Sequence, residues 1–279
     1  MSKTVLITGC STGIGRSLAL ELHSRGLKVY ATARRPETLD GLSEQGLRTL
    51  ALDVNDDNSI AQAMAVVEAE SGQLDMLVNN AGFSQVGAMV DLKREDLRRQ
   101  YETNVIAPVA VTQAALPLMR KAVAANGVAD LVNIGSIVGL FTTPFAGAYC
   151  SSKACVHAVT DALRMELTPF GIRTITVQPG GVRSSFGDNA EEGIRLPEGS
   201  LYKPVEAGIQ ARAQAGQQGA TLTDEFVRPV VDKLLSANPP MVIRGGKGSV
   251  SLVMMKRLLP ARLFDQSLIK RFGLDKLMS

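Results

Sequence analysis

Residues 8–15, "TGCSTGIG", connect a short β-rich run to an amphipathic stretch. Three of these eight residues are glycine. Glycine loses more conformational freedom on folding than any other residue, so three together indicate a backbone that turns tightly or closely approaches another group. In the stretch that follows, Leu18 and Leu22 stand four apart, and Gly26 is typical of a helix end. The order is therefore strand, glycine-rich turn and helix.

The same alternation of strands and helices continues along the chain. The β-rich runs are "KTVLIT", "KVYATA", "RTLAL", "LDMLVNN", "ADLVNIG", "RTITVQ" and "PMVIRG". Each is nearly continuously apolar, as expected for strands that helices cover on both faces. Amphipathic stretches lie between them, around residues 57–70, 94–121, 152–168 and 223–236. The pattern predicts an α/β fold with one doubly wound, seven-stranded parallel sheet and helices on both faces.

One domain is expected over residues 1–246, because no linker rich in Pro, Ser or Gly divides the chain and no internal repeat occurs. Residues 183–222 are long, polar and dotted with glycine. Loops of this length tend to be functional or disordered, and we expect this one to form a substrate lid. Residues 247–279 are expected to form a helical extension in which Pro260 separates two helices.

The composition argues against several classes of function. A net charge of +3 and an aromatic content of 4% give neither a basic stripe nor base-stacking platforms, so no nucleic-acid partner is expected. The two histidines lie outside any Cys/His cluster, so no metal site is expected, and His157 with Asp161 is interpreted as a surface or subunit-packing pair. Three cysteines without paired spacing indicate free thiols in a reducing compartment. With no secretory signal and no run of about 18 apolar residues, a cytoplasmic location is expected.

The glycine-rich turn has the position of a phosphate-binding loop. Gly9 would allow the tight turn, Gly13 would let the backbone approach a ligand, and Gly15 would let the helix pack on the strand. Amides at the helix start would then face the pyrophosphate of a dinucleotide, as in a Rossmann fold. The spacing is GxxxGxG instead of GxGxxG. The alternative is a glycine-rich surface turn.

The end of the second strand indicates which dinucleotide is bound. An acidic residue about 20 positions after the turn would bind the ribose 2′-hydroxyl, whereas an arginine suits a 2′-phosphate. Arg34 and Arg35 occupy this region, and no carboxylate lies between Lys28 and Pro36. A guanidinium binds phosphate in a bidentate manner, and Arg16 would add charge. We therefore predict NADP(H) over NAD(H); the alternative is that both arginines are solvated loop charges.

A tyrosine, a lysine and a serine are candidates for acid–base chemistry. Tyr149 and Lys153 stand four apart in "AYCSSKACVHAV", a spacing that places both on one helix face. An adjacent ammonium stabilises a phenolate, so Lys153 is expected to lower the pKa of Tyr149 and make it a usable proton donor and acceptor. Ser136 ends the fifth strand in "NIGSIVG". It would lie at the carboxyl edge of the sheet, where ligands bind.

Together these motifs resemble the short-chain dehydrogenase/reductase family over roughly the first 245 residues. "TGCSTGIG" resembles its cofactor loop, and "NNAG" at residues 79–82 its strand-four motif. Asn104 in "TNV", Ser136, and Tyr149 with Lys153 match its catalytic residues. "PGGVRS" resembles its nicotinamide-binding segment, with Ser184 where threonine is usual.

The resemblance implies a role for each matching residue. Tyr149 would exchange a proton with the substrate oxygen, and Ser136 would hydrogen-bond that oxygen. Lys153 would bind the nicotinamide ribose, and Asn104 would hold a water that links Lys153 to solvent. Further cofactor contacts are implied at Ser11, Thr12, Ile14, Asp53, Val54, Asn79, Ala81, Gly82, Pro179, Gly180, Val182 and Ser184. Helices near residues 94–121 and 152–168 would pair subunits in a homodimer or homotetramer.

The substrate and the tail are less closely defined. "VYATARRPE" and "NPPMVIRGG" are similar to the branch of 17β-hydroxysteroid, retinol and acyl-dihydroxyacetone-phosphate reductases, which implies an apolar ketone or alcohol. Leu140, Phe141 and Phe145 would lie near the pocket or in the core. In the tail, the apolar residues Phe264, Leu268 and Phe272 recur every four positions among basic ones.

This tail stripe could lie in a membrane interface. The favoured interpretation is that it closes the pocket or packs against a second subunit, because such stripes usually reflect burial. The alternatives to an enzyme are a binding protein that senses NADP(H) without turnover and a membrane-peripheral protein anchored by this tail.

Overall fold

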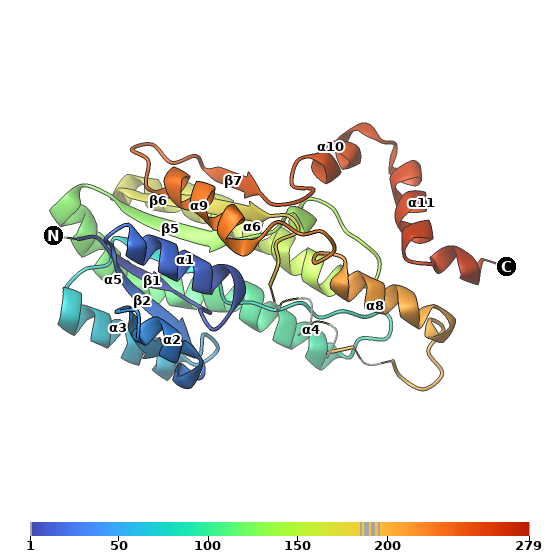
Figure 1. Ribbon diagram of the computed structural model, residues 1–279, viewed down its shortest axis with the longest axis horizontal. Helices are drawn as coiled ribbons and strands as arrows, with labels where there is room; N and C mark the ends of the chain where they lie inside the picture. The colour runs from blue at the N-terminus through green and yellow to red at the C-terminus, as the bar shows by residue number, and fades with distance from the viewer. Residues whose placement is uncertain (1, 185, 187–189, 191–192, 195, 279) are drawn as a thin grey trace.

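Seven parallel strands form one sheet in the computed structural model, which describes residues 2–184, 186, 190, 193–194 and 196–278. The strands are β1 (Thr4–Ile7), β2 (Lys28–Ala33), β3 (Arg48–Ala51), β4 (Met76–Asn79), β5 (Ala129–Ile134), β6 (Ile172–Pro179) and β7 (Val242–Gly245). Their order is β3-β2-β1-β4-β5-β6-β7, which reverses between β1 and β4. The predicted doubly wound sheet is confirmed, and its switch point lies where β1 and β4 end (Figure 1).

Helices cover both faces of the sheet. The helices among the described residues are α1 (Gly13–Ser24), α2 (Asp40–Ser43), α3 (Asp57–Ser71), α4 (Arg94–Tyr101), α5 (Ala107–Asn126), α6 (Gly147–Leu167), α8 (Glu206–Gln214), α9 (Thr223–Leu234), α10 (Ser251–Leu258) and α11 (Ala261–Arg271). Helices α1 and α9 lie on one face, and α3 and α5 on the other. Side chains alternate across each strand, so Val5 and Ile7 belong to the core beneath α1 and α9. Leu6 belongs to the opposite core, beneath α3 and α5. The sheet therefore lies between two apolar layers, and Figure 1 shows helices on its two sides.

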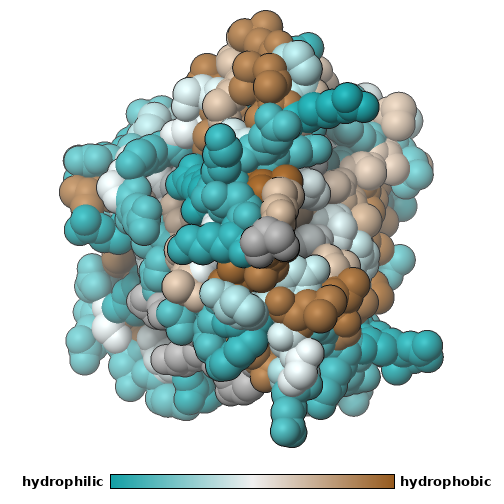
Figure 2. Space-filling model, turned by 90° about the vertical axis from the view of Figure 1, so that its right-hand side faces the viewer, coloured by the Kyte–Doolittle hydropathy of each residue, from teal (hydrophilic) through white to brown (hydrophobic). Residues whose placement is uncertain are grey.

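A third core lies beyond the carboxyl edge of the sheet, where the end of the chain packs against the lid region (Figure 2 views this end). The tail residues Phe264, Leu268 and Phe272 are all buried there. They pack in one cluster with Ile209 of α8 and with Phe141, whose ring lies 5.8 Å from that of Phe264, edge to face. Parts of the expected lid, at 185, 187–189, 191–192 and 195, lie outside the described residues.

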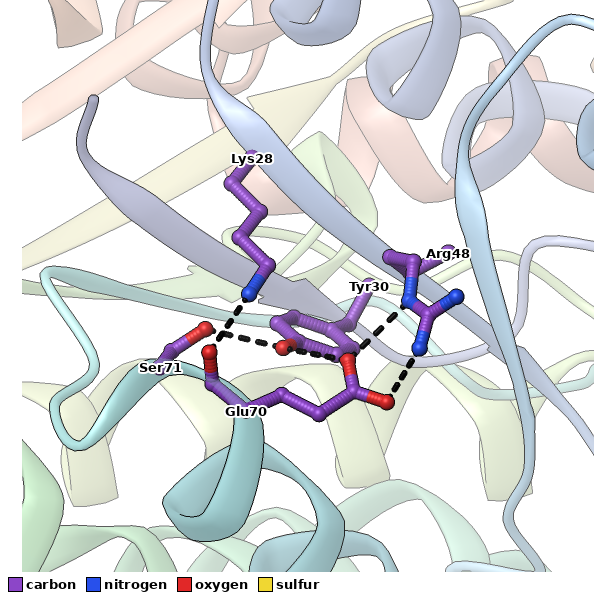
Figure 3. A network of polar contacts seen from close by, with 5 residues as sticks. All are labelled: Lys28, Tyr30, Arg48, Glu70 and Ser71. Atoms are coloured by element: carbon purple, nitrogen blue, oxygen red, sulfur yellow. Dashed lines mark hydrogen bonds and ion pairs between the residues drawn. The ribbon is translucent and has the colours of Figure 1, made fainter.

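A polar network joins the beginnings of β2 and β3 to the end of α3 (Figure 3). Tyr30 is fully buried, and its hydroxyl hydrogen-bonds Glu70 at 3.0 Å and Ser71 at 2.8 Å. Arg48 Nε donates to the same Glu70 carboxylate at 3.0 Å. Lys28 Nζ donates to the Glu70 carbonyl at 2.9 Å. Because Lys28 and Arg48 begin β2 and β3, this network fixes the end of α3 far from the carboxyl edge.

Candidate active site

The glycine-rich turn between β1 and α1 has the geometry of an anion cradle. Gly9 has φ +73° and Gly13 has φ +59°, conformations that side chains rarely adopt. A Cβ at Gly15 would collide with the Gly9 carbonyl and the Asn80 amide, so α1 packs directly against the turn. Thr12 precedes the helix without capping it, and the first turn carries no acidic residue. Its amides therefore suit a pyrophosphate.

A cavity of about 1420 Å³ extends from this turn to the tail helices. Sixteen of the residues expected to bind cofactor line it: Gly9, Ser11, Thr12, Gly13, Ile14, Gly15, Arg34, Arg35, Asp53, Val54, Ala81, Gly82, Pro179, Gly180, Val182 and Ser184. Several of them follow the carboxyl ends of β1, β2, β4 and β6, around the switch point. The residues present therefore fit an extended dinucleotide.

Asn79 is the exception and requires a correction. It does not line the cavity, because its side chain points from β4 toward α5. Its Nδ2 donates to Thr112 Oγ1 at 3.1 Å and to Asn133 Oδ1 at 2.9 Å, so the amide is directed to α5 and β5 instead of the cavity. The following residue, Asn80, lines the cavity instead. Asn80 Nδ2 donates to the carbonyls of Thr8 at 2.8 Å and Gly9 at 2.9 Å, and so holds the glycine turn.

The structure brings Ser136, Tyr149 and Lys153 together at the centre of the cavity. Ser136 follows β5, and Tyr149 and Lys153 lie one turn apart on α6. The Ser136 side chain lies near enough to Tyr149 to favour the ionised form of the phenol. Lys153 Nζ donates to the Ile134 carbonyl at 2.7 Å and lies 5.9 Å from the centroid of the Tyr149 ring. A phenol, a hydroxyl and an ammonium therefore face one space.

The expected effect of Lys153 on Tyr149 is not found in this geometry. Burial raises the pKa of Tyr149 to about 12, although the nearby Ser136 side chain and the charge of Arg212 act in the opposite direction. Burial also lowers the pKa of Lys153 to about 8. The expectation of an acidic phenol is therefore corrected, because Lys153 is directed to a backbone carbonyl and desolvation dominates. Tyr149 is protonated at neutral pH, which is the state that a proton donor needs.

Asn104 lies behind the cavity wall instead of lining it. A π-helical turn, η2 (Glu102–Ile106), interrupts the expected long helix between α4 and α5 and carries Asn104 inward. Its Oδ1 accepts the Phe83 amide at 3.1 Å, and its Nδ2 donates to Ser152 Oγ at 3.1 Å. A Cβ at Gly82 would lie 3.0 Å from Asn104 Oδ1 and 3.9 Å from Lys153 Nζ. In this structure Asn104 therefore positions the segment after β4, beside the lysine.

His157 lies against the loop that carries Ser136, a position that the sequence interpretation missed. Its Nε2 accepts the Ser136 amide at 3.4 Å, and a Cβ at Gly135 or Gly139 would collide with its ring. Burial and the charge of Lys153 lower its pKa to about 4, so the imidazole is neutral. The expectation of a surface pair is corrected, because the His157 ring packs against the loop that carries Ser136, whereas the subunit-packing alternative stays a prediction. Asp161 instead pairs with Arg164 at 2.9 Å.

The cavity continues beyond Tyr149 between the lid and the tail. Phe141, Phe264 and Leu268 give it apolar walls, whereas Phe145 lies in the core and Leu140 is exposed. Besides Arg34, Arg35 and Lys153, the cavity is lined by the cations Arg99, Arg212, Lys247 and Arg271. Arg212 Nε donates to Thr143 Oγ1 at 2.6 Å, and its guanidinium forms no ion pair with any described residue. No sequence motif indicated these cations, since they come from distant segments.

Known proteins resemble this chain along most of its length. The family model described as short chain dehydrogenase matches residues 3–194. The short-chain dehydrogenase cctT of Talaromyces islandicus is 34% identical over 99% of this chain and 98% of its own length. An NADPH-dependent 1-acyldihydroxyacetone phosphate reductase of Schizosaccharomyces pombe is 37% identical over 87% of this chain and 79% of its own. The crystal structure of a short-chain dehydrogenase from Streptomyces avermitilis superposes with a TM-score of 0.79 at 29% identity, covering 100% and 99% of the two chains.

Proposed function

Because the chain belongs to the short-chain dehydrogenase family of oxidoreductases, we propose that it interconverts a carbonyl and an alcohol by hydride transfer with NADP(H). One observation carries this proposal: the glycine cradle and the side chains of Ser136, Tyr149 and Lys153 open into the same cavity. The cradle suits the phosphates of a dinucleotide, and the three side chains suit a substrate oxygen.

The chain's own residues would bind and protonate the substrate. The nicotinamide, when bound, supplies the hydride to the carbonyl or accepts it from the alcohol. Tyr149 holds its proton at neutral pH and would donate it to the carbonyl oxygen, while the Ser136 hydroxyl stabilises the charge that develops there. Lys153, fixed by the Ile134 carbonyl, would place its ammonium beside the nicotinamide ribose and the phenol. In oxidation, the phenol oxygen would take the proton back.

Tyr149→Phe tests this mechanism. The substitution removes the proton donor without changing the shape of the ring, so we expect turnover to fall by about 100- to 10,000-fold. NADPH affinity, measured by fluorescence, should be retained because the glycine cradle is untouched. Full turnover in Tyr149→Phe would contradict the mechanism. If the wild type binds NADPH but reduces no ketosteroid, retinal or aliphatic ketone, the alternative of a non-catalytic NADP(H)-sensing protein gains support.

Two arginines support the preference for NADP(H). Arg34 and Arg35 follow β2, are exposed, and line the cavity. The first carboxylate after the strand is Glu37, in the short helix η1 (Pro36–Leu39). The S. pombe relative is NADPH-dependent, by its name. We expect a combined Arg34→Ala and Arg35→Ala change to raise KM for NADPH while KM for NADH changes little. Arg228→Ala, an exposed position outside the cavity lining, is the matched control.

The walls of the cavity support an apolar substrate such as a steroid, retinoid or lipid-like ketone. Phe141, Phe264 and Leu268 provide the apolar surface. The S. pombe relative is named for a substrate that carries both an acyl chain and a phosphate. Turnover should therefore rise with the length of the apolar chain in a series of aliphatic ketones. Light scattering would test the accompanying proposal of a homodimer or homotetramer that pairs through α4, α5 and α6.

A further inference from the structure

Helix α10 is apolar on two opposite sides. Its inner side, with Leu252, Val253 and Met255, packs against the third core. Its outer side carries an independent stripe in which Val250, Met254 and Leu258 recur every four residues. Their exposed fractions are 67%, 44% and 73%. An apolar side of a helix is normally covered, and none of the described residues buries the outer side of α10.

The connection to α11 extends this stripe. Leu259 and Leu263 are 36% and 53% exposed, so the two helices form one outer apolar surface consisting of Val250, Met254, Leu258, Leu259 and Leu263. Figure 2 shows hydrophobic atoms gathered at the top of the molecule, where Figure 1 places α10 and the start of α11. Contiguous exposed apolar groups of this kind mark interaction sites.

The surrounding charge identifies the partner. Arg257 and Arg262 are exposed beside the outer apolar surface, and neither forms an ion pair within the described part of the chain. From α10 to Phe264 the chain carries Lys256, Arg257 and Arg262 and no aspartate or glutamate, and Asp265 follows in α11. Exposed leucines with arginines beside them suit an anionic bilayer, into which the apolar groups insert while the cations meet phosphate. A second copy of this surface would bring like charges together.

We propose that the outer apolar surface docks the protein on an anionic phospholipid bilayer. This surface differs from the tail stripe of Phe264, Leu268 and Phe272, which is buried over the cavity. No helix among the described residues has the length and apolarity to cross a membrane, so docking would be peripheral. Ser251, Leu252 and Met255 of α10 line the cavity, so the docked helix would form the rim nearest the lipid. That an apolar substrate enters the cavity from the lipid rests on the proposed function. The docking itself does not depend on that function.

Co-sedimentation of the full chain with phosphatidylcholine vesicles, with and without phosphatidylserine, tests the docking. We expect binding to vesicles that contain phosphatidylserine and its loss at high salt. Leu258→Asp with Leu263→Asp should weaken binding at least about 100-fold, since each buried leucine contributes roughly a factor of 10 or more. Arg257→Glu with Arg262→Glu should abolish the preference for phosphatidylserine. Met241→Asp, at a position 61% exposed elsewhere, is the matched control and should bind normally.

Two results would overturn the proposal. One is a wild-type protein that stays in the supernatant with phosphatidylserine vesicles. The other is a doubly aspartate-substituted protein that dissociates from oligomer to monomer in light scattering, which would assign the surface to a second copy of the chain. NADPH oxidation with a water-soluble ketone should be unchanged in every variant, because none of these residues lies in the catalytic machinery. Failure of docking is thereby separated from failure of the enzymatic proposal.

Discussion

Replacing His157 tests whether a neutral imidazole holds Ser136 in place. His157→Leu removes the acceptor of the Ser136 amide, whose hydrogen bond to Nε2 is 3.4 Å long. A bond of this length contributes little by itself, but a buried amide left without a partner costs about 1–3 kcal/mol. At about 2–4 °C per kcal/mol, the middle of this range lowers Tm by about 4–8 °C. If the loop shifts to recover a partner, Ser136 moves, and a displacement of about 1 Å costs about 100-fold in kcat.

His157→Gln is the conservative control, since its amide oxygen can occupy the position of Nε2. We expect it to recover most of kcat, while NADPH affinity stays unchanged in both variants. The wild type and His157→Gln should also differ in how much stability they lose at acidic pH. The pKa of His157 is lowered to about 4, against about 6.5 in the unfolded chain, so the wild type loses stability as pH falls between these values. His157→Gln should lose less stability over the same pH range, because glutamine does not titrate there. Wild-type kcat in His157→Leu would refute the positioning role.

Two further predictions concern a charge in the cavity and the network at the far edge of the sheet. Arg212→Gln removes a positive charge that lowers the pKa of Tyr149, so the rise of the oxidation rate with pH should shift to higher pH; an unchanged pH–rate profile would count against this coupling. Glu70→Ala removes partners of Tyr30 and Arg48, so thermal melts should show a loss of about 1 kcal/mol, or roughly 2–4 °C, with kcat unchanged; an altered kcat would show that the network reaches the active site.

The repeated pattern of apolar strands and amphipathic helices was sufficient to predict the sheet and its two helical layers. The three glycines of residues 8–15 likewise predicted the cradle, because tight turns and close approach restrict the residue type. Sequence motifs alone do not show whether Asn79 or Asn80 faces the cavity. Which of them faces the cavity depends on where β4 ends, and a shift of one residue reverses the direction of a side chain.

The remaining differences arise from tertiary contacts between distant segments. The periodicity of Phe264, Leu268 and Phe272 identified an apolar face but not its partner, which is the third core. His157 packs against the Ser136 loop because Gly135 and Gly139 leave room for its ring, a feature of loop geometry that no helical pattern encodes. The high pKa of Tyr149 likewise depends on burial, which a spacing of four residues does not report.

The contact between Gly208 and the tail couples two segments that α9, β7 and α10 separate along the chain. A Cβ at Gly208 would collide with the carbonyl oxygen of Phe272, so α8 meets the end of α11 backbone to backbone. Closely packed backbones transmit displacement instead of absorbing it. Any outward movement of the lid helix must therefore carry the tail with it, and a protein whose tail is held at a lipid surface would open its substrate chamber against that restraint.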